Sequence, residues 1–162
     1  MRSNAAAEQE DSMGWISDLV GGGRRRPEHV PPPPPSPRDV QIATAVLLLE
    51  VSAADHDVDE REKREIVRSI ESAFALSAEE TAEIVAVAGQ RSSEAVSLYE
   101  FTRLVDRSLS REHKATIIEL LFRVAFADGW LAGEEEQVIR KVATLLHVEH
   151  PAFIAAKLRA KG

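Results

Sequence analysis

The sequence predicts an all-α fold of about seven helices in two pseudo-symmetric halves, and three observations lead to this prediction. After Asp39, apolar residues recur at spacings of three and four, which is the period of an amphipathic helix. Leu, Val, Ile and Ala recur throughout this part while aromatic residues make up only 5% of the chain, a composition that favours helices over strands. Two stretches 73 residues apart also resemble one another, which indicates a duplicated unit.

Start and stop signals delimit the expected helices, which span about residues 40–54, 60–75, 78–88, 97–109, 111–127, 134–146 and 151–160. A capping box of Ser77 and Glu80 opens the third helix, and Gly89 is expected to end it. Ser110 is placed to cap the fifth helix. Pro151 suits the first position of the last one.

The chain is predicted to consist of an N-terminal segment, residues 1–38, and a helical domain, residues 39–162. From Gly21 to Arg38, glycines, arginines and prolines form a linker, in which five consecutive prolines favour a semi-rigid spacer or, alternatively, a ligand for a proline-reading domain. A short amphipathic stretch precedes the linker. We expect this stretch to dock on the domain or, as the alternative, to anchor on a partner or peripherally on a membrane surface. Its apolar residues are Trp15, Ile16, Leu19 and Val20.

Charge and composition narrow the classes of partner and location. The net charge is −7, and residues 1–38 hold five Arg and five acids, so the whole negative excess belongs to the helical domain. Because an acidic domain repels phosphate backbones, we expect no nucleic-acid partner and favour cations or the basic surface of a protein partner not yet identified. Without cysteine there is no disulfide framework, so a cytoplasmic location is expected. The sequence contains no apolar run of about 18 residues, so no transmembrane helix is predicted.

Motifs for catalysis are missing from the sequence. There is no glycine-rich phosphate loop, no serine elbow and no HExxH, and the histidines show no paired spacing for zinc. The carboxylates are expected in solvent-facing turns, where nothing shifts their pKa values. We therefore expect that the protein is not an enzyme.

The internal repeat covers a helix, a loop and a second helix. Residues 47–55 (LLLEVSAAD) correspond to residues 120–128 (LLFRVAFAD), and the match continues without a gap. Identities over the first twenty positions fall at Leu47, Leu48, Val51, Ala54, Asp55, Glu62 and Ile66. These identities make a duplication the preferred interpretation.

Both copies place an Asp at the end of the first helix and a Glu seven residues later, giving the pairs Asp55/Glu62 and Asp128/Glu135. The Glu is explained by the helix dipole, which favours acids in a first turn by about 0.3–1 kcal/mol. The Asp lies at the unfavourable end of the dipole, so its charge needs compensation. Two alternatives are an Asx-turn, with Gly129 left-handed in the second copy, and a bound cation.

The first acidic loop has the larger set of cation ligands. Asp55, Asp57 and Asp59 alternate along it and Glu62 follows, an arrangement that offers oxygens to a hard divalent cation such as Ca²⁺ or Mg²⁺. It is not an EF-hand, because a glutamate stands where the loop glycine is required. The second loop keeps Asp128 and Glu135 but lacks the other carboxylates, so it is the weaker site.

Residues 121–131 (LFRVAFADGWL), Glu135 and residues 138–148 (VIRKVATLLHV) resemble the TerB family associated with bacterial tellurite resistance. The resemblance covers about residues 40–161. It implies two pseudo-symmetric helical halves, a role in resistance to tellurite and other stresses, and acids of both halves converging on one face to bind a divalent metal. The acids implied are Asp55, Glu62, Asp128 and Glu135, to which Asp57 and Asp59 could add. The chain departs from the family pattern at His56, where Gly is usual, and at Ala132, where an acid is common. Two functions remain open: a cation-binding adaptor, or a metal-independent helical module for protein–protein interaction.

Overall fold

The computed structural model describes residue 31 and residues 33–55, 58–94 and 97–162. These residues form seven helices and no strand, which confirms the predicted fold class. The chain divides into two units, residues 1–33 and residues 34–162, and all seven helices lie in the second. The helices are α2 (Pro37–Ser52), α3 (Glu60–Phe74), α4 (Ala78–Ser93), α5 (Leu98–Ser108), α6 (Arg111–Ala125), α7 (Gly133–Leu145) and α8 (His150–Lys161). The predicted amphipathic stretch at residues 15–20 and most of the predicted linker lie outside the described residues.

Helix α2 begins at Pro37, three residues before the predicted start. Ser36 is its N-cap: the Ser36 hydroxyl accepts a hydrogen bond from the Asp39 N–H at 3.2 Å, and the Asp39 carboxylate accepts one from the Ser36 N–H at 2.9 Å. Pro37 fits directly after this capping box because a first helical position needs no N–H donor. Pro37 and Arg38, which the sequence had placed in the linker, therefore belong to the helical domain.

Helix α4 continues past Gly89, so the predicted stop there is wrong. The helix runs to Ser93, and Glu94 is its C-cap. Gly89 does not adopt a positive φ. A glycine inside an exposed helix costs only about 1 kcal/mol relative to alanine, which a packed domain tolerates. The predicted caps at Ser77 and Ser110 are confirmed.

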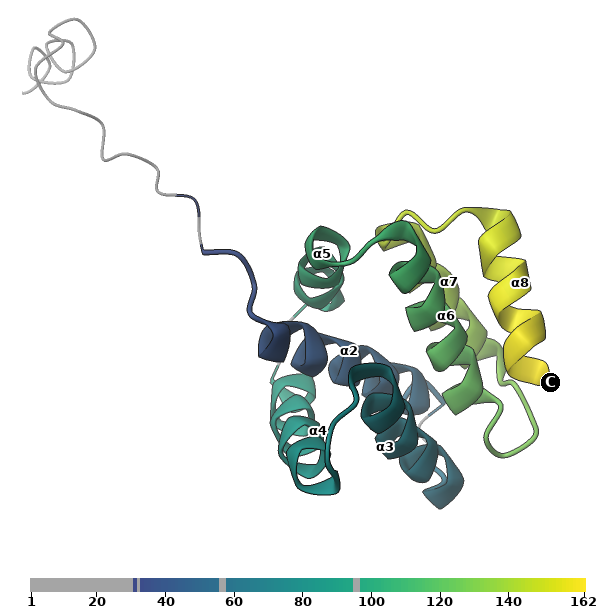
Figure 1. Ribbon diagram of the computed structural model, residues 1–162. Coiled ribbons are helices and arrows are strands. Elements are labelled where there is room, and N and C mark those ends of the chain that lie inside the picture. Colours follow the sequence, from purple (N-terminus) through teal and green to yellow (C-terminus); the bar gives the residue numbers. More distant parts are fainter. Residues whose placement is uncertain (1–30, 32, 56–57, 95–96) are drawn as a thin grey trace, which may run out of the picture. The chain divides into compact units, whose positions relative to one another are not determined.

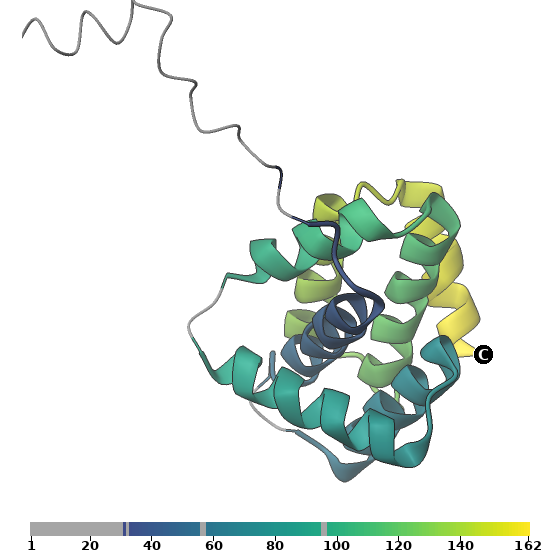
Figure 2. The same cartoon turned by 60° about the vertical axis from the view of Figure 1, so that its left-hand side comes forward.

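Helix α2 lies in the middle of the domain (Figure 2) and packs against α3, α4, α5, α6 and α7. Its side chains from Ala45 to Leu48 are at most 1% exposed. Helix α6 is the second main element of the core, and α8 packs alongside it (Figure 1). The most extensive helix contacts are those of α2 with α4 and of α6 with α8, so the first and third helices of each half pack together. None of the described helices is long and apolar enough to cross a membrane.

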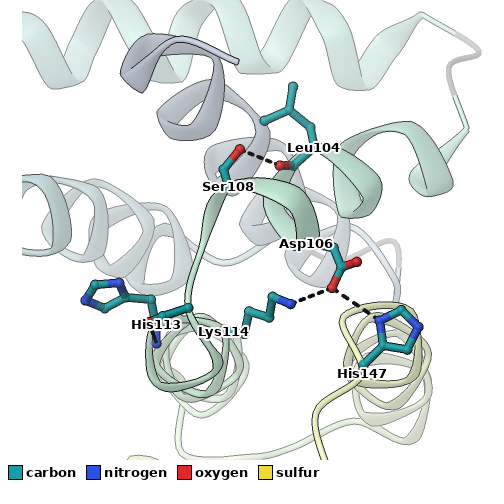
Figure 3. A network of polar contacts seen from close by, with 7 residues as sticks. Leu104, Asp106, Ser108, His113, Lys114 and His147 are labelled. Carbon is teal, nitrogen blue, oxygen red and sulfur yellow. Dashed lines mark hydrogen bonds and ion pairs between the residues drawn. The ribbon is translucent and has the colours of Figure 1, made fainter. Parts of the chain in front are cut away.

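A polar network ties α5 to the second half of the domain (Figure 3). The Asp106 carboxylate on α5 accepts a hydrogen bond from Lys114 Nζ on α6 at 2.7 Å and lies 3.2 Å from His147 Nδ1 at the end of α7. The hydrogen bond from Lys114 lowers the pKa of Asp106, so this carboxylate is ionised at neutral pH. His147 adopts a left-handed φ of 58°, which few residues other than glycine accept without strain.

Candidate functional site

Each acidic loop follows the end of a helix, and the distance in sequence from the helix end to the Asp is the same in both loops. Helix α2 ends at Ser52 and α6 ends at Ala125, so Asp55 and Asp128 each lie three residues beyond the helix rather than at its last residue. Both aspartates are half-buried. The predicted helix ends at residues 54 and 127 are therefore two residues too late, because each helix closes on a backbone cap, at Ala53 and at Phe126.

Two of the acidic residues, Asp128 and Asp59, have a local structural role in a turn or a helix cap. The Asp128 carboxylate accepts a hydrogen bond from the Trp130 N–H at 2.9 Å, and Gly129 has a φ of 87°, which confirms the predicted Asx-turn in the second loop. Asp59 is the N-cap of α3, and its carboxylate accepts a bond from the Arg61 N–H at 2.7 Å. Asp57 lies outside the described residues.

The two glutamates of the repeat are buried, although the sequence placed them in solvent-facing turns. Glu62 and Glu135 occupy the same position in the first turns of α3 and α7, and each is only 1% exposed. The prediction was wrong because the first turn of α3 packs against the last turn of α2, where Ser52 Oγ donates a hydrogen bond to Glu62 Oε2 at 2.6 Å. A favourable helix dipole explains an acid at this position but does not require its burial.

The buried glutamates differ in their hydrogen-bond partners. Glu135 Oε2 accepts a bond from the Ala132 N–H at 3.0 Å, whereas Glu135 Oε1 has no hydrogen-bond partner among the described residues. The residue that corresponds to Ser52 in the second copy is Ala125, which carries no hydroxyl. Ser52 was not identified as a site residue from the sequence. The alignment of the two copies does show the difference, since it places Ser52 opposite Ala125.

The structure brings the four repeat acids into one electrostatic cluster. Burial raises the pKa of Glu62, and the charges of Asp55 and Asp128 add to this effect. Burial also raises the pKa of Glu135 to about 7, again with contributions from the neighbouring acids Glu62, Asp55 and Asp128. The expectation of unshifted pKa values is therefore wrong for both glutamates. A cluster of this kind takes up a positive charge, either a proton or a cation.

The arrangement of the cluster bears on metal binding. Among the residues that the structure describes, no three or more His, Cys, Asp or Glu side chains stand together in positions that would hold a metal ion. The oxygens are of the kind that hard cations such as Ca²⁺ and Mg²⁺ prefer, and Glu135 Oε1 is buried with no hydrogen-bond partner among the described residues. The donor set therefore fits such a cation by chemistry, while the carboxylates would have to rotate to surround it.

Trp130, next to the cluster, is the most exposed large apolar side chain of the described residues, at 74%. It follows the Asx-turn of Asp128, and Leu131 behind it packs against the core. Between Arg123 and Arg140 the sequence has no Lys or Arg. The loop thus presents an exposed aromatic ring within a stretch of sequence whose charged residues are all acidic.

These features define a class: an all-helical domain in which two helix–loop–helix segments assemble four carboxylates into one partly buried cluster. The family model described as tellurite resistance protein TerB matches residues 41–158, and the chain belongs to this family. A search of curated proteins finds no match. Among solved structures, a protein of unknown function from Porphyromonas gingivalis W83 is similar, with 14% identity and a TM-score of 0.60 over 76% of this chain and 94% of that one. At this identity the similarity bears on the fold alone.

Proposed function

We propose that this TerB-family chain is a non-enzymatic stress-response protein of the tellurite-resistance type, which binds a divalent cation at its paired acidic loops and acts as an adaptor. The ligands are the carboxylates of Asp55, Glu62, Asp128 and Glu135, and the cation is Ca²⁺ or Mg²⁺. Binding would hold the two loops together and so change the surface offered to a partner.

One observation carries the proposal: Glu135 Oε1 is buried beside three other carboxylates and has no hydrogen-bond partner in the described part of the chain. An unsatisfied buried acceptor normally costs about 1–3 kcal/mol, so a ligand that satisfies it gains that free energy. Backbone donors account for one oxygen of Glu135 but leave the other one open.

A calcium or magnesium titration of the full chain, followed by its melting temperature, tests the proposal. A ligand that binds only the folded state at 100 times its Kd adds about 2.7 kcal/mol to stability. For a domain of this size, that gain raises the melting temperature by roughly 10 °C. An unchanged melting temperature at millimolar metal would refute the proposal.

A matched pair of variants separates specific binding from general charge screening. Asp128→Asn with Glu135→Gln removes two acids from the cluster and should abolish the metal-dependent rise. Glu79→Gln with Glu112→Gln removes two exposed acids from the first turns of α4 and α6 and should leave the rise intact. An equal loss in both double variants would indicate screening rather than a site.

Trp130 supports a second candidate, a metal-independent module that binds a basic segment of a protein partner. An exposed Trp is a frequent anchor of interfaces, and an arginine stacks favourably on its ring. Asp128 and Glu134, which are near it in the sequence and not buried, supply the complementary charge. Binding of an arginine-rich peptide should then persist in EDTA and should weaken about tenfold in Trp130→Ala.

Tyr99 on α5 provides the control for this experiment because it is also exposed, at 56%. Tyr99→Ala should leave peptide affinity unchanged, and neither variant should alter the melting temperature. Equal effects of the two substitutions, or loss of binding when metal is removed, would exclude the metal-independent module.

A further inference from the structure

Two adjoining cavities lie on the second unit, where the start of α2, the end of α3 and the turn between α5 and α6 meet. The first has a volume of about 430 Å³ and the second of about 240 Å³. Phe74 and Leu109 line both cavities, so the two adjoin at these side chains. We call the two cavities together the Phe74 groove. It contains none of the four acids of the cluster.

The lining of the Phe74 groove is apolar with basic side chains and no acidic ones. Ile117 and Leu120 of α6 continue the apolar surface that Phe74 and Leu109 begin. The titratable residues in the lining are Arg107 and His113. The absence of carboxylates from both linings contrasts with a net charge of −7 for the chain. The groove is therefore complementary to a molecule with an apolar body and a negative charge.

Both basic side chains remain available to a ligand. Among the described residues, neither the Arg107 guanidinium nor the His113 imidazole makes an ion pair or a hydrogen bond, while the His113 backbone N–H donates to Ser110 Oγ at 3.3 Å. In Figure 3, His113 points to the opposite side of α6 from Lys114. The nearby carboxylate of Asp106 is already engaged by Lys114 and lies against His147, so it does not neutralise the groove.

We propose that the Phe74 groove binds a small amphiphilic anion, a carboxylate carried on an aliphatic chain. The chain lies on Phe74, Leu109 and Ile117, and the carboxylate bonds to Arg107 at one end of the cavity. Arginine suits this role because its planar guanidinium donates two parallel hydrogen bonds to a carboxylate. The charge of a cationic amphiphile would be repelled by Arg107, and a neutral amphiphile would form no ion pair with it.

Decanoate, at concentrations below micelle formation, is the probe. The full chain is titrated with decanoate, decanol and decyltrimethylammonium while the amide signals of Leu109 and Ile117 are followed by NMR. Decanoate should shift both signals in a saturable way and bind about tenfold more tightly than decanol, the gain expected from a charge-assisted hydrogen bond. The ammonium compound should produce no saturable shift.

Two matched pairs of variants locate the site. Arg107→Gln should weaken decanoate binding about tenfold, whereas Arg103→Gln, one turn earlier on the exposed side of α5, should have no effect. Thr116→Trp should fill the second cavity and abolish binding. Thr144→Trp is its control, because Thr144 is also an exposed helix threonine bonded to the carbonyl four residues before it.

The proposal is overturned if decanoate and decanol bind equally, since the groove would then recognise only apolar surface. It is also overturned if decanoate fails to bind because another part of this chain or a second copy fills the groove. A second copy would show itself as a dimer that Thr116→Trp dissociates. Equal effects of Arg107→Gln and Arg103→Gln would equally contradict it.

Discussion

The two acid pairs occupy equivalent places in the repeat, yet their buried glutamates differ in their hydrogen-bond donors. Glu62 receives a hydrogen bond from the Ser52 hydroxyl, whereas the second copy has Ala125 there, and one oxygen of Glu135 has no hydrogen-bond partner among the residues that the structure describes. Glu135 is accordingly the residue whose pKa reaches about 7. The Ser52 hydroxyl is thus one difference between the two buried carboxyl groups, which also interact with one another.

The largest expected effect tests whether the two halves are equally packed. Leu48 and Leu121 correspond in the repeat, and both are 0% exposed. Leu48→Ala and Leu121→Ala should each lower the free energy of unfolding by about 2–5 kcal/mol through loss of apolar burial and formation of a cavity. Urea denaturation measures both values. A difference of more than twofold would mean that one half dominates the core.

The pH dependence of stability should distinguish the two glutamates. The folded state raises the pKa of Glu135 from 4.5 to about 7, so it holds this proton more tightly than the unfolded chain does. The stabilisation is fully present below pH 4.5 and is lost as pH rises through 7. At roughly 1.4 kcal/mol per pKa unit, the loss amounts to at most about 3 kcal/mol.

The measurement is the difference in unfolding free energy between the wild type and Glu135→Gln from pH 4 to 9 in EDTA. Glu62→Gln is the comparison, because the pKa of Glu62 is also raised but the Ser52 bond opposes the shift. Glu135→Gln should remove more of the pH dependence than Glu62→Gln. A flat difference curve for Glu135→Gln would contradict the burial of its carboxyl group.

Exchanging the hydroxyl between the copies should exchange their properties. Ser52→Ala leaves Glu62 Oε2 buried without its donor and should cost about 1–2 kcal/mol. Ala125→Ser supplies Glu135 with a donor and should lower its pKa, which NMR titration of the side-chain carboxyl carbon follows. An unchanged pKa in Ala125→Ser would show that the two sites differ in more than this residue.

The smallest effect concerns the helix ends after the acid pairs. Ala75 after α3 and His147 after α7 adopt left-handed φ values of 51° and 58°. Ala75→Gly should stabilise the domain by at most about 1 kcal/mol by relieving strain. His147→Gly should gain less, because it also loses the contact with Asp106. Thermal unfolding of the two variants measures the difference, and a larger gain for His147→Gly would exclude a stabilising role for that contact.

Local signals in the sequence predicted the fold well. Ser77 and Ser110 cap helices as expected, and Gly129 turns the second acidic loop. These features depend on residues within a few positions of one another. The prediction at Gly89 was wrong because glycine, although common after helix ends, is also tolerated inside an exposed helix.

The sequence proposed the residues of the candidate site, but it did not predict their environment. The repeat identified Asp55, Glu62, Asp128 and Glu135, yet the burial of the glutamates depends on how α3 and α7 pack against other helices. Sequence patterns gave no reason to expect burial, because the helix dipole already explained an acid in each first turn. The outward position of Trp130 likewise follows from the anchoring of Leu131 in the core.

The central position of α2 has a consequence for the motions of the domain. Five helices cover it, so its middle turn cannot be reached by solvent through the opening of any single neighbour. The backbone amides from Val46 to Leu48 should therefore exchange with deuterium only when the whole domain unfolds. The exchange rate of these amides reports global stability, whereas the loop amides beside the acid cluster report local opening. One hydrogen-exchange experiment therefore separates the effect of a ligand on global stability from its effect on the loops.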